Sequence, residues 1–405
     1  MALDILNDAM VAPDPLIEEL GAAIHSLPEA CGPDTIVRSV VCARTALWYL
    51  GRNGPLVTNK DRLRADLFID MLVDAVTRSS SGRDIKMVFW SKSPHTSVYT
   101  FDKPFGFLDG RIASAFDFSL IVKEYFTSRG DPDIFKVMAV GKLYKALYAQ
   151  RKASPSFPHC EITARTMRRI ISRRSGKLLA FEHTAPDGEL RSTARAVADA
   201  ASSLVSYCDK HYGGAPVDSY AEKTMRRASR LLPFLPLESR SLLRRTLRRD
   251  AAAIAQHLEN AVLLPHVDPT SKNIVLERDG SLRFIDLEKV LELRVNAQHL
   301  FAHVWFDPVY PFSFDERAGL LGEKGLPAAG YYLLSRVSRA LDGRLRSPFV
   351  QWDEAVRKRF DGYVGLLCQV SSNLANEYGL FDALRHIDAG GIAGEFLQVQ
   401  NHRHS

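Results

Sequence analysis

One short segment in the second half of the chain places polar side chains between apolar stretches at a distinctive spacing. His266, Asp268 and Asn273 follow an apolar stretch in the order H-x-D-x-x-x-x-N, and Asp286 follows a second apolar stretch after an Asp-Gly turn. The pattern predicts a loop and two short strands joined by a tight turn. This arrangement would bring carboxylate and amide groups close together. One carboxylate could then accept a proton, and the other oxygens could bind a hard cation.

Composition sets the outer bounds on the fold. A chain of 405 residues suggests two or three structural units. Apolar residues make up 46% and charged residues 25%, which is ordinary for a globular protein. The formal charge of +6 suits anionic ligands such as nucleotides. Because no aromatic residues interleave with the basic stretches, we expect no nucleic-acid partner.

Cysteine usage and hydropathy bear on the cellular compartment. The five cysteines form no C-x-x-C pair and show no zinc-ligand spacing, so we expect reduced thiols. The first residues lack the features of a signal peptide, and no apolar run approaches the roughly 20 residues that span a bilayer. We therefore expect a cytoplasmic protein without membrane association, although a bacterial protein delivered to a host cell would share these features.

Hydrophobic periodicity indicates the organisation of the chain. Four parts are expected: an N-terminal α/β extension (1–94), a strand-rich part (95–186), a helix-rich part that contains the motif (187–385) and a tail (386–405). Within the strand-rich part, apolar runs predict strands over 119–126 and 177–184, and helical spacing predicts a helix over 133–152. Strands before helices favour an α+β fold with two lobes.

Arginine clusters are the other prominent feature. We interpret most of them as solvated faces of basic helices, with binding of an anionic acceptor or a protein partner as the alternative. The clustered residues are Arg165, Arg168, Arg169, Arg173 and Arg174, and further on Arg226, Arg227, Arg230, Arg244, Arg245, Arg248 and Arg249.

The motif resembles that of the protein-kinase-like superfamily, and within it the aminoglycoside and choline phosphotransferase branch. Members carry a His-Gly-Asp run, an asparagine five residues after the aspartate, and a later Ile-Asp followed by an aromatic residue. Here Val267 stands in place of the glycine and Leu287 in place of the aromatic residue. The resemblance covers about residues 96–375. It implies a bilobal protein-kinase-like fold, with a small antiparallel β-sheet N-lobe and a larger, mostly helical C-lobe.

The resemblance also implies that ATP and Mg²⁺ are bound, and it assigns roles to the motif. Asp268 would orient an acceptor hydroxyl and take its proton, while His266 would brace the loop. Asn273 and Asp286 would hold magnesium, with Glu288 as a further metal ligand or supporting group. The structural alternatives are a plain turn at Asp-Pro-Thr-Ser and a surface charge at Glu288.

The N-lobe correspondence is looser. Lys123, in an apolar strand, would hold the nucleotide phosphates, and Glu161 is the only candidate for its usual carboxylate partner. The backbone carbonyl of Glu182 and the backbone amide of Thr184 would meet the adenine. A surface lysine and an ordinary buried strand are the alternatives. No glycine-rich phosphate loop is recognisable in this part.

The resemblance therefore implies an ATP- and Mg²⁺-dependent phosphotransferase that acts on a hydroxylated small molecule. A protein kinase or effector of the same fold is a second possibility, although residues 287–320 contain no Ala-Pro-Glu element. A pseudokinase-like binding or scaffold protein is a third. The missing helix glutamate and glycine loop favour that third possibility, whereas the intact Asp268, Asn273 and Asp286 oppose it.

Overall fold

The computed structural model describes residues 66, 70, 86–93, 96–102, 119–160, 164–174, 176–181, 185–277, 279–341 and 354–392. Two compact units divide the chain, one of residues 1–144 with 162–175 and the other of residues 145–161 with 176–405. The described residues form a mixed α+β fold that is mostly helical with small antiparallel sheets, which confirms the predicted fold class. Most of the predicted N-terminal extension lies outside the described residues.

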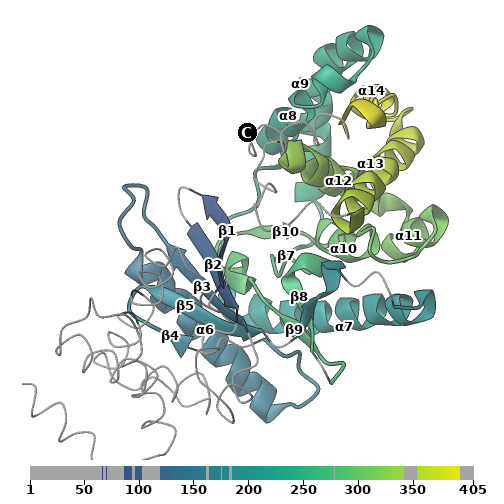
Figure 1. Ribbon diagram of the computed structural model, residues 1–405. Coiled ribbons are helices and arrows are strands. Elements are labelled where there is room, and N and C mark those ends of the chain that lie inside the picture. Colours follow the sequence, from purple (N-terminus) through teal and green to yellow (C-terminus); the bar gives the residue numbers. More distant parts are fainter. Residues whose placement is uncertain are drawn as a thin grey trace, which may run out of the picture. The chain divides into compact units, whose positions relative to one another are not determined.

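The first unit contains an antiparallel sheet of five strands in the order β1-β2-β3-β5-β4 (Figure 1). The strands are β1 (Lys86–Ser93), β2 (Thr96–Asp102), β3 (Ser119–Tyr125), β4 (Ala164–Arg165) and β5 (Arg169–Arg174). Strand β3 lies in the middle of the sheet and confirms the strand predicted over 119–126. Its Lys123 pairs with Val98 on one side and with Ile170 on the other.

Arg169 corrects the interpretation of the first arginine cluster. It lies in strand β5 rather than on a helix, and it is buried. Its guanidinium group contacts Glu124 at 2.6 Å, Asp70 at 2.7 Å and Asp66 at 3.2 Å. The β-branched Ile170 that follows it is also buried and favours a strand. Three carboxylates thus make burial of this charge tolerable.

Helix α6 (Ile134–Ala153) follows strand β3 and confirms the helix predicted over 133–152. Oδ1 of Asp133 accepts a hydrogen bond of 2.9 Å from the backbone N–H of Lys136, so Asp133 acts as the helix cap. Val137, Val140, Leu143 and Leu147 are fully buried at helical spacing, which gives the helix one apolar face.

The second unit is largely helical. Its helices are α7 (Asp187–Tyr212), α8 (Tyr220–Ser229), α9 (Leu237–Glu259), α10 (Ala297–Trp305), α11 (Phe314–Leu321), α12 (Leu326–Leu341), α13 (Glu354–Leu374) and α14 (Gly379–Leu384). Helices α8, α9, α12, α13 and α14 pack against one another in one group (Figure 1). None of the helices in the described part of the chain combines the length and apolar character needed to cross a membrane.

Two small sheets in the second unit hold the motif. Strand β7 (Leu263–Pro265) pairs with β10 (Arg294–Asn296), and β8 (Ile274–Leu276) lies between β6 (Lys177–Leu178) and β9 (Leu282–Phe284). The strand predicted over 177–184 is therefore wrong in its length. Because β8 begins only at Ile274, the ladder ends at Leu178, and residues Leu179–Phe181 form a 3-10 turn instead.

Candidate functional site

The motif loop is fixed by the strands on either side of it. Strand β7 ends just before His266, whose backbone N–H donates to the carbonyl oxygen of Leu293 at 3.2 Å. The β8–β9 hairpin begins just after the loop, and Ile285 N–H donates to the carbonyl oxygen of Asn273 at 2.9 Å. That bond places Asp286, the next residue, at the same end of the hairpin as Asn273.

Asp268 and Asp286, two carboxylates of the sequence motif, also have an unusual backbone conformation. Asp268 has φ of 42° and Asp286 has φ of 64°, and no other non-glycine residue in the described part of the chain has a positive φ. The left-handed region is sparsely populated by non-glycine residues, although aspartate tolerates it better than most. Such backbone outliers cluster at functional sites, where surrounding structure holds them in place.

The carboxylate of Asp268 is surrounded by donors. Its Oδ1 accepts from Nδ1 of His303 at 2.9 Å and from Oγ1 of Thr270 at 3.3 Å, and its Oδ2 forms an ion pair with Lys289. The residue is only 2% exposed. Burial by itself would raise the pKa of Asp268, but Lys289 and His303 together hold it well below its usual range. Asp268 is therefore an ionised carboxylate across the physiological pH range.

Two histidines of helix α10 extend this network. An ionised carboxylate can only accept, so His303 must donate from Nδ1 to Asp268. Burial lowers the pKa of His303 to about 4, so its other nitrogen, Nε2, carries no proton at neutral pH. Nε2 of His299 lies 3.2 Å from it and must then be the donor. Nδ1 of His299 is left as a buried acceptor without a hydrogen-bond partner in the described part of the chain.

His266 occupies the position that the sequence predicts for a bracing residue. Its Nδ1 accepts a hydrogen bond of 3.3 Å from the backbone N–H of Asp268, two residues along the loop. Burial and the nearby Lys289 ammonium group lower the pKa of His266 well below its usual value, so the ring is neutral. A neutral ring whose Nδ1 accepts a backbone hydrogen bond is suited to support the loop. This arrangement does not require His266 to take part in the chemistry.

His266, Asp268 and His303 also place potential metal-ligand atoms within 4.8 Å of one another. All three residues are buried, and two neutral imidazoles with one carboxylate are a common ligand set. However, Lys289 already neutralises the Asp268 carboxylate in an ion pair. The hydrogen bonds described above also engage Nδ1 of both histidines. A network closed in this way favours hydrogen-bond support of Asp268 over a metal centre.

Asn273 and Asp286 are suited to the predicted role of magnesium ligands. Nδ2 of Asn273 donates to the backbone carbonyl of Asp268 at 3.1 Å, which orients the amide and leaves its Oδ1 as a hard oxygen donor. The backbone bond between Ile285 and Asn273 keeps Asp286, the next residue, at the same end of the hairpin. Glu288, in the 3-10 turn Leu287–Leu291, is buried rather than a surface charge. Amide and carboxylate oxygens are the ligand types that a small hard cation prefers.

The carboxylate of Asp307, which was not predicted from the sequence, holds the loop through Ser271. Oδ2 of Asp307 accepts from the backbone N–H of Ser271 at 3.1 Å and from its hydroxyl at 2.6 Å. Nη2 of Arg359, on helix α13, contacts the same carboxylate oxygen at 3.1 Å. Asp307 is fully buried, and these contacts hold its pKa below the usual value despite that burial.

Asn296 also has a clear structural role. Its Oδ1 accepts from the backbone N–H of His299 at 2.9 Å, so it caps helix α10. Its Nδ2 donates to the carbonyl oxygen of Leu258 at 3.1 Å. The cap orients the first turn of α10, which carries His299, and so supports the arrangement around Asp268.

The predicted nucleotide contacts belong to the first unit or lie outside the described residues. Lys123 is in the first unit, where its Nζ lies 5.5 Å from the centre of the Tyr125 ring. Glu161, Glu182 and Thr184 lie outside the described residues. The structure therefore brings together His266, Asp268, Asn273 and Asp286 within one unit, and the nucleotide-binding roles of the other residues stay predictions.

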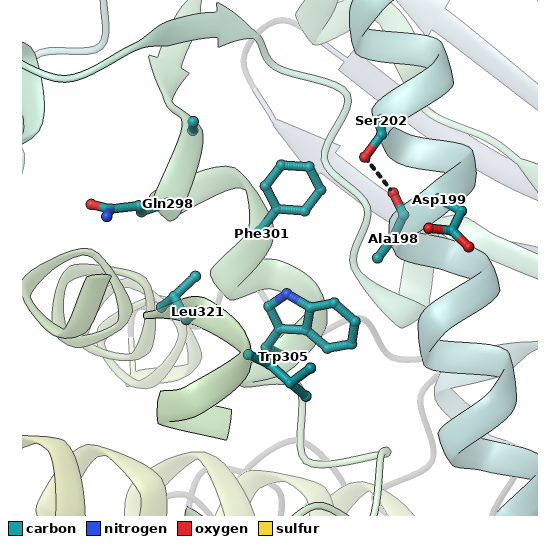
Figure 2. A pocket seen from close by; sticks show the side chains of 9 residues that line it. Ala198, Asp199, Ser202, Gln298, Phe301, Trp305 and Leu321 are labelled. Carbon is teal, nitrogen blue, oxygen red and sulfur yellow. Dashed lines mark hydrogen bonds between the residues drawn. The ribbon is translucent and has the colours of Figure 1, made fainter. Parts of the chain in front are cut away.

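One pocket of about 340 Å³ lies between helices α7, α10 and α11 (Figure 2). Phe301 and Trp305 of α10 face Ala198 and Ser202 of α7 across it. His299 and His303 project from the opposite side of the same helix because residues two positions apart lie on different faces. This pocket is therefore separate from the surroundings of Asp268.

Lys289, His299, His303 and Asp307 are the residues that sequence reasoning missed. A histidine pair at i and i+4, as in His299 and His303, places two imidazoles on one face of a helix and was a readable signal. Lys289 follows Asp286 by three residues, within the 3-10 turn that begins after that aspartate. No sequence pattern pointed to Asp307, because it lies 36 residues from Ser271 and contacts it only in the folded chain.

No protein-family model and no curated protein matches the sequence. Among solved structures, the chain is similar to an aminoglycoside 2'-phosphotransferase-IIIa in its GDP complex, with 12% identity, a TM-score of 0.42 and coverage of 76% of this chain and 98% of that one.

Two further similar structures are small-molecule kinases. The Plasmodium vivax ethanolamine kinase has 11% identity, a TM-score of 0.39 and coverage of 86% of this chain and 96% of that one. The choline kinase from Cryptosporidium parvum has 12% identity, a TM-score of 0.34 and coverage of 84% and 96%. All three similarities are distant, and the function proposed below rests on the side chains of this chain.

Proposed function

We propose that the protein is an ATP- and Mg²⁺-dependent phosphotransferase that moves the terminal phosphoryl group of the nucleotide to a hydroxyl group of a small molecule. The observation that carries the proposal is the ionised Asp268, whose backbone is left-handed, with Asn273 and Asp286 at the same end of one hairpin. Phosphoryl transfer depends on positioning and charge neutralisation, and this arrangement supplies both.

Each residue has a defined task in this proposal. Asp268 accepts a hydrogen bond from the acceptor hydroxyl, orients its oxygen toward the phosphorus, and takes the proton as the new P–O bond forms. Asn273 and Asp286 would hold magnesium, which when bound would neutralise the charge of the phosphates. Lys289, already in contact with Asp268, supplies a further positive charge beside the transferred group.

His303 and Asn273 position Asp268 rather than react. His303 fixes the direction of the carboxylate through its contact with Oδ1, and Asn273 fixes the backbone through the Asp268 carbonyl. Preorganised contacts of this kind hold the carboxylate in place, so that little reorganisation is needed when the proton moves.

One observation favours a second candidate, a binding protein of the same fold without transfer activity. Asp268 is 2% exposed, and donors contact both of its carboxylate oxygens. Each carboxylate oxygen can accept about two hydrogen bonds, and Oδ1 already accepts two, from His303 and Thr270. An acceptor hydroxyl can therefore bind only at Oδ2, where it must share that oxygen with Lys289 or displace it.

The transfer of label from γ-phosphate-labelled ATP to a panel of hydroxylated compounds tests the proposal. The wild-type protein should label at least one compound in the presence of Mg²⁺. Asp268→Asn should lower the rate by a factor of about 10² or more while nucleotide affinity stays nearly unchanged, because only the proton acceptor is lost. Equal labelling by the variant would exclude the assigned role of Asp268.

A further inference from the structure

Some buried arginines of the second unit lie outside the ion pairs among its described residues. Asp268 is paired with Lys289, Asp307 with Arg359, and Asp218 with Lys223. Three arginines of the same unit stand apart from these pairs: Arg227 on helix α8, and Arg336 and Arg339 on helix α12. Within the described part of the chain, none of the three lies within 4.0 Å of a carboxylate oxygen.

Two of these arginines are deeply buried. Arg227 is 5% exposed and Arg336 is 6% exposed. Their contacts are mainly with aromatic rings: the Arg227 guanidinium lies 5.0 Å from the Tyr331 ring centre, and that of Arg336 lies 5.8 Å from the ring of Tyr332. Nε of Arg336 has no hydrogen-bond partner in the described part of the chain. Arginine stays protonated, so within the described residues these two buried cations have no carboxylate at ion-pair distance.

All three arginines are associated with helix α12: Arg336 and Arg339 belong to it, and Arg227 lies over the ring of its Tyr331. Burial, followed by the charges of Arg227 and Arg336, lowers the pKa of Arg339 to about 10. The ring of Tyr332, over which Arg336 lies, is 4.5 Å from the ring of His303, which donates to Asp268. Arg336 and Arg339 are three residues apart on α12 and therefore project to neighbouring parts of one face.

We propose that Arg227, Arg336 and Arg339 form an anion-binding subsite, and that the small-molecule acceptor carries an oxyanion group in addition to its reactive hydroxyl. This inference rests on the phosphotransferase function proposed above and narrows its acceptor to compounds that bear a carboxylate or a phosphate. A guanidinium group binds either oxyanion through two parallel hydrogen bonds. The unbalanced arginines disfavour a cationic acceptor, because like charges in a buried site repel strongly.

The subsite is tested by thermal unfolding of the whole chain in sodium phosphate, sodium acetate and sodium chloride at matched ionic strength. Phosphate or acetate should raise Tm beyond chloride, and the stronger of the two identifies the oxyanion. Arg336→Gln and Arg227→Gln should weaken the apparent affinity for that anion about tenfold or more, because each removes a charged hydrogen bond. Arg248→Gln, on the exposed face of α9, removes the same charge and should leave the affinity unchanged.

Stability without anion separates a binding role from a structural one. Loss of an unbalanced buried charge should leave Tm of Arg336→Gln in chloride equal to or above that of the wild type. A large fall would mean that Arg336 supports the fold. Arg339→Gln, which is less buried, should also lose protection by the anion and provides the second test.

The subsite would be overturned if phosphate or acetate raised Tm equally in all variants. It would also be overturned if neither anion raised Tm beyond the value in chloride. Loss of the protection when a saturating Mg²⁺–ATP analogue is present would overturn it as well, because the anion would then occupy the nucleotide phosphate site. These measurements use neither ATP turnover nor an acceptor. Their failure would leave the proposed phosphoryl transfer standing, and a failed transfer assay would leave the anion result standing.

Discussion

Nδ1 of His303 lies 2.9 Å from Oδ1 of Asp268, although 35 residues separate them in the sequence. This contact joins the motif loop to helix α10 and fixes the direction of the carboxylate that would accept the proton. His299 continues the chain of hydrogen bonds from the other nitrogen of His303. Helix α10 thus contributes one of the contacts that orient the central carboxylate of the site.

Replacement of His303 tests that orienting contact. Because the donor fixes the Asp268 carboxylate, His303→Ala should lower kcat about tenfold or more with little change in KM for ATP. His303→Asn, whose side-chain amide can still donate, should recover part of the rate. Steady-state kinetics with the labelled-ATP assay measures both. Equal rates for the wild type and His303→Ala would show that the contact plays no part in catalysis.

Lys289 should control the acidic limb of the pH–rate profile. Its charge is a main cause of the lowered pKa of Asp268, so Lys289→Met should raise that pKa. The acidic limb of kcat/KM should then move to higher pH, since a protonated carboxyl group cannot accept the proton. Lys289→Arg keeps the charge and should leave the limb near its wild-type position. An unmoved limb in Lys289→Met would contradict the ion pair's proposed role.

The three neutral histidines should make the fold sensitive to mild acid. Burial, the first cause, lowers the pKa of each of His266, His299 and His303 in the folded chain. Between their ordinary pKa near 6.5 and the value of about 4 for His303, the unfolded chain binds more protons than the folded one.

Stability should therefore fall as the pH is lowered from about 6.5 toward 4. Urea unfolding at several pH values measures this slope. His299→Gln should make the slope shallower, whereas His211→Gln, at an exposed position, should not. A stability that stays constant over this range would be inconsistent with neutral buried imidazoles.

Asp307 should be among the residues most important for stability in the second unit. Asp307→Ala would leave the partly buried guanidinium of Arg359 and the buried backbone N–H of Ser271 without their carboxylate, at a cost of about 3 kcal/mol. The exposed pair of Arg357 and Asp361 provides the control, because Asp361→Ala should cost no more than about 0.5 kcal/mol. Denaturant unfolding monitored by circular dichroism compares the two. Similar losses in both variants would mean that the Asp307 network contributes little.

The sequence predicted the loop and hairpin of the motif because its signals are local. Asp268, Asn273 and Asp286 stand at strand ends and turn positions, and the 3.6-residue period marks α6 and the long helices. The supporting residues could not be found in this way. Lys289 and His303 lie 21 and 35 residues from Asp268, and only tertiary packing brings them together.

Arg169 shows why a basic run in the sequence does not reveal which arginine is buried. A run of basic residues is typical of a solvated surface, yet Asp66, Asp70 and Glu124 converge on this guanidinium in the folded chain. Two of these carboxylates are about 100 residues away, beyond any local pattern. The same reasoning applies to Arg227, which sequence analysis grouped with solvated helix faces and which is buried.

The most direct test of the central claim is calorimetric titration of the protein with a non-hydrolysable ATP analogue, with and without Mg²⁺. We predict binding by the wild type that depends on Mg²⁺, loss of the Mg²⁺-dependent part in Asp286→Asn, and its retention in Asp268→Asn. Absence of nucleotide binding, or binding that Mg²⁺ and Asp286→Asn leave unchanged, would contradict the assignment of these carboxylates to a phosphotransferase site.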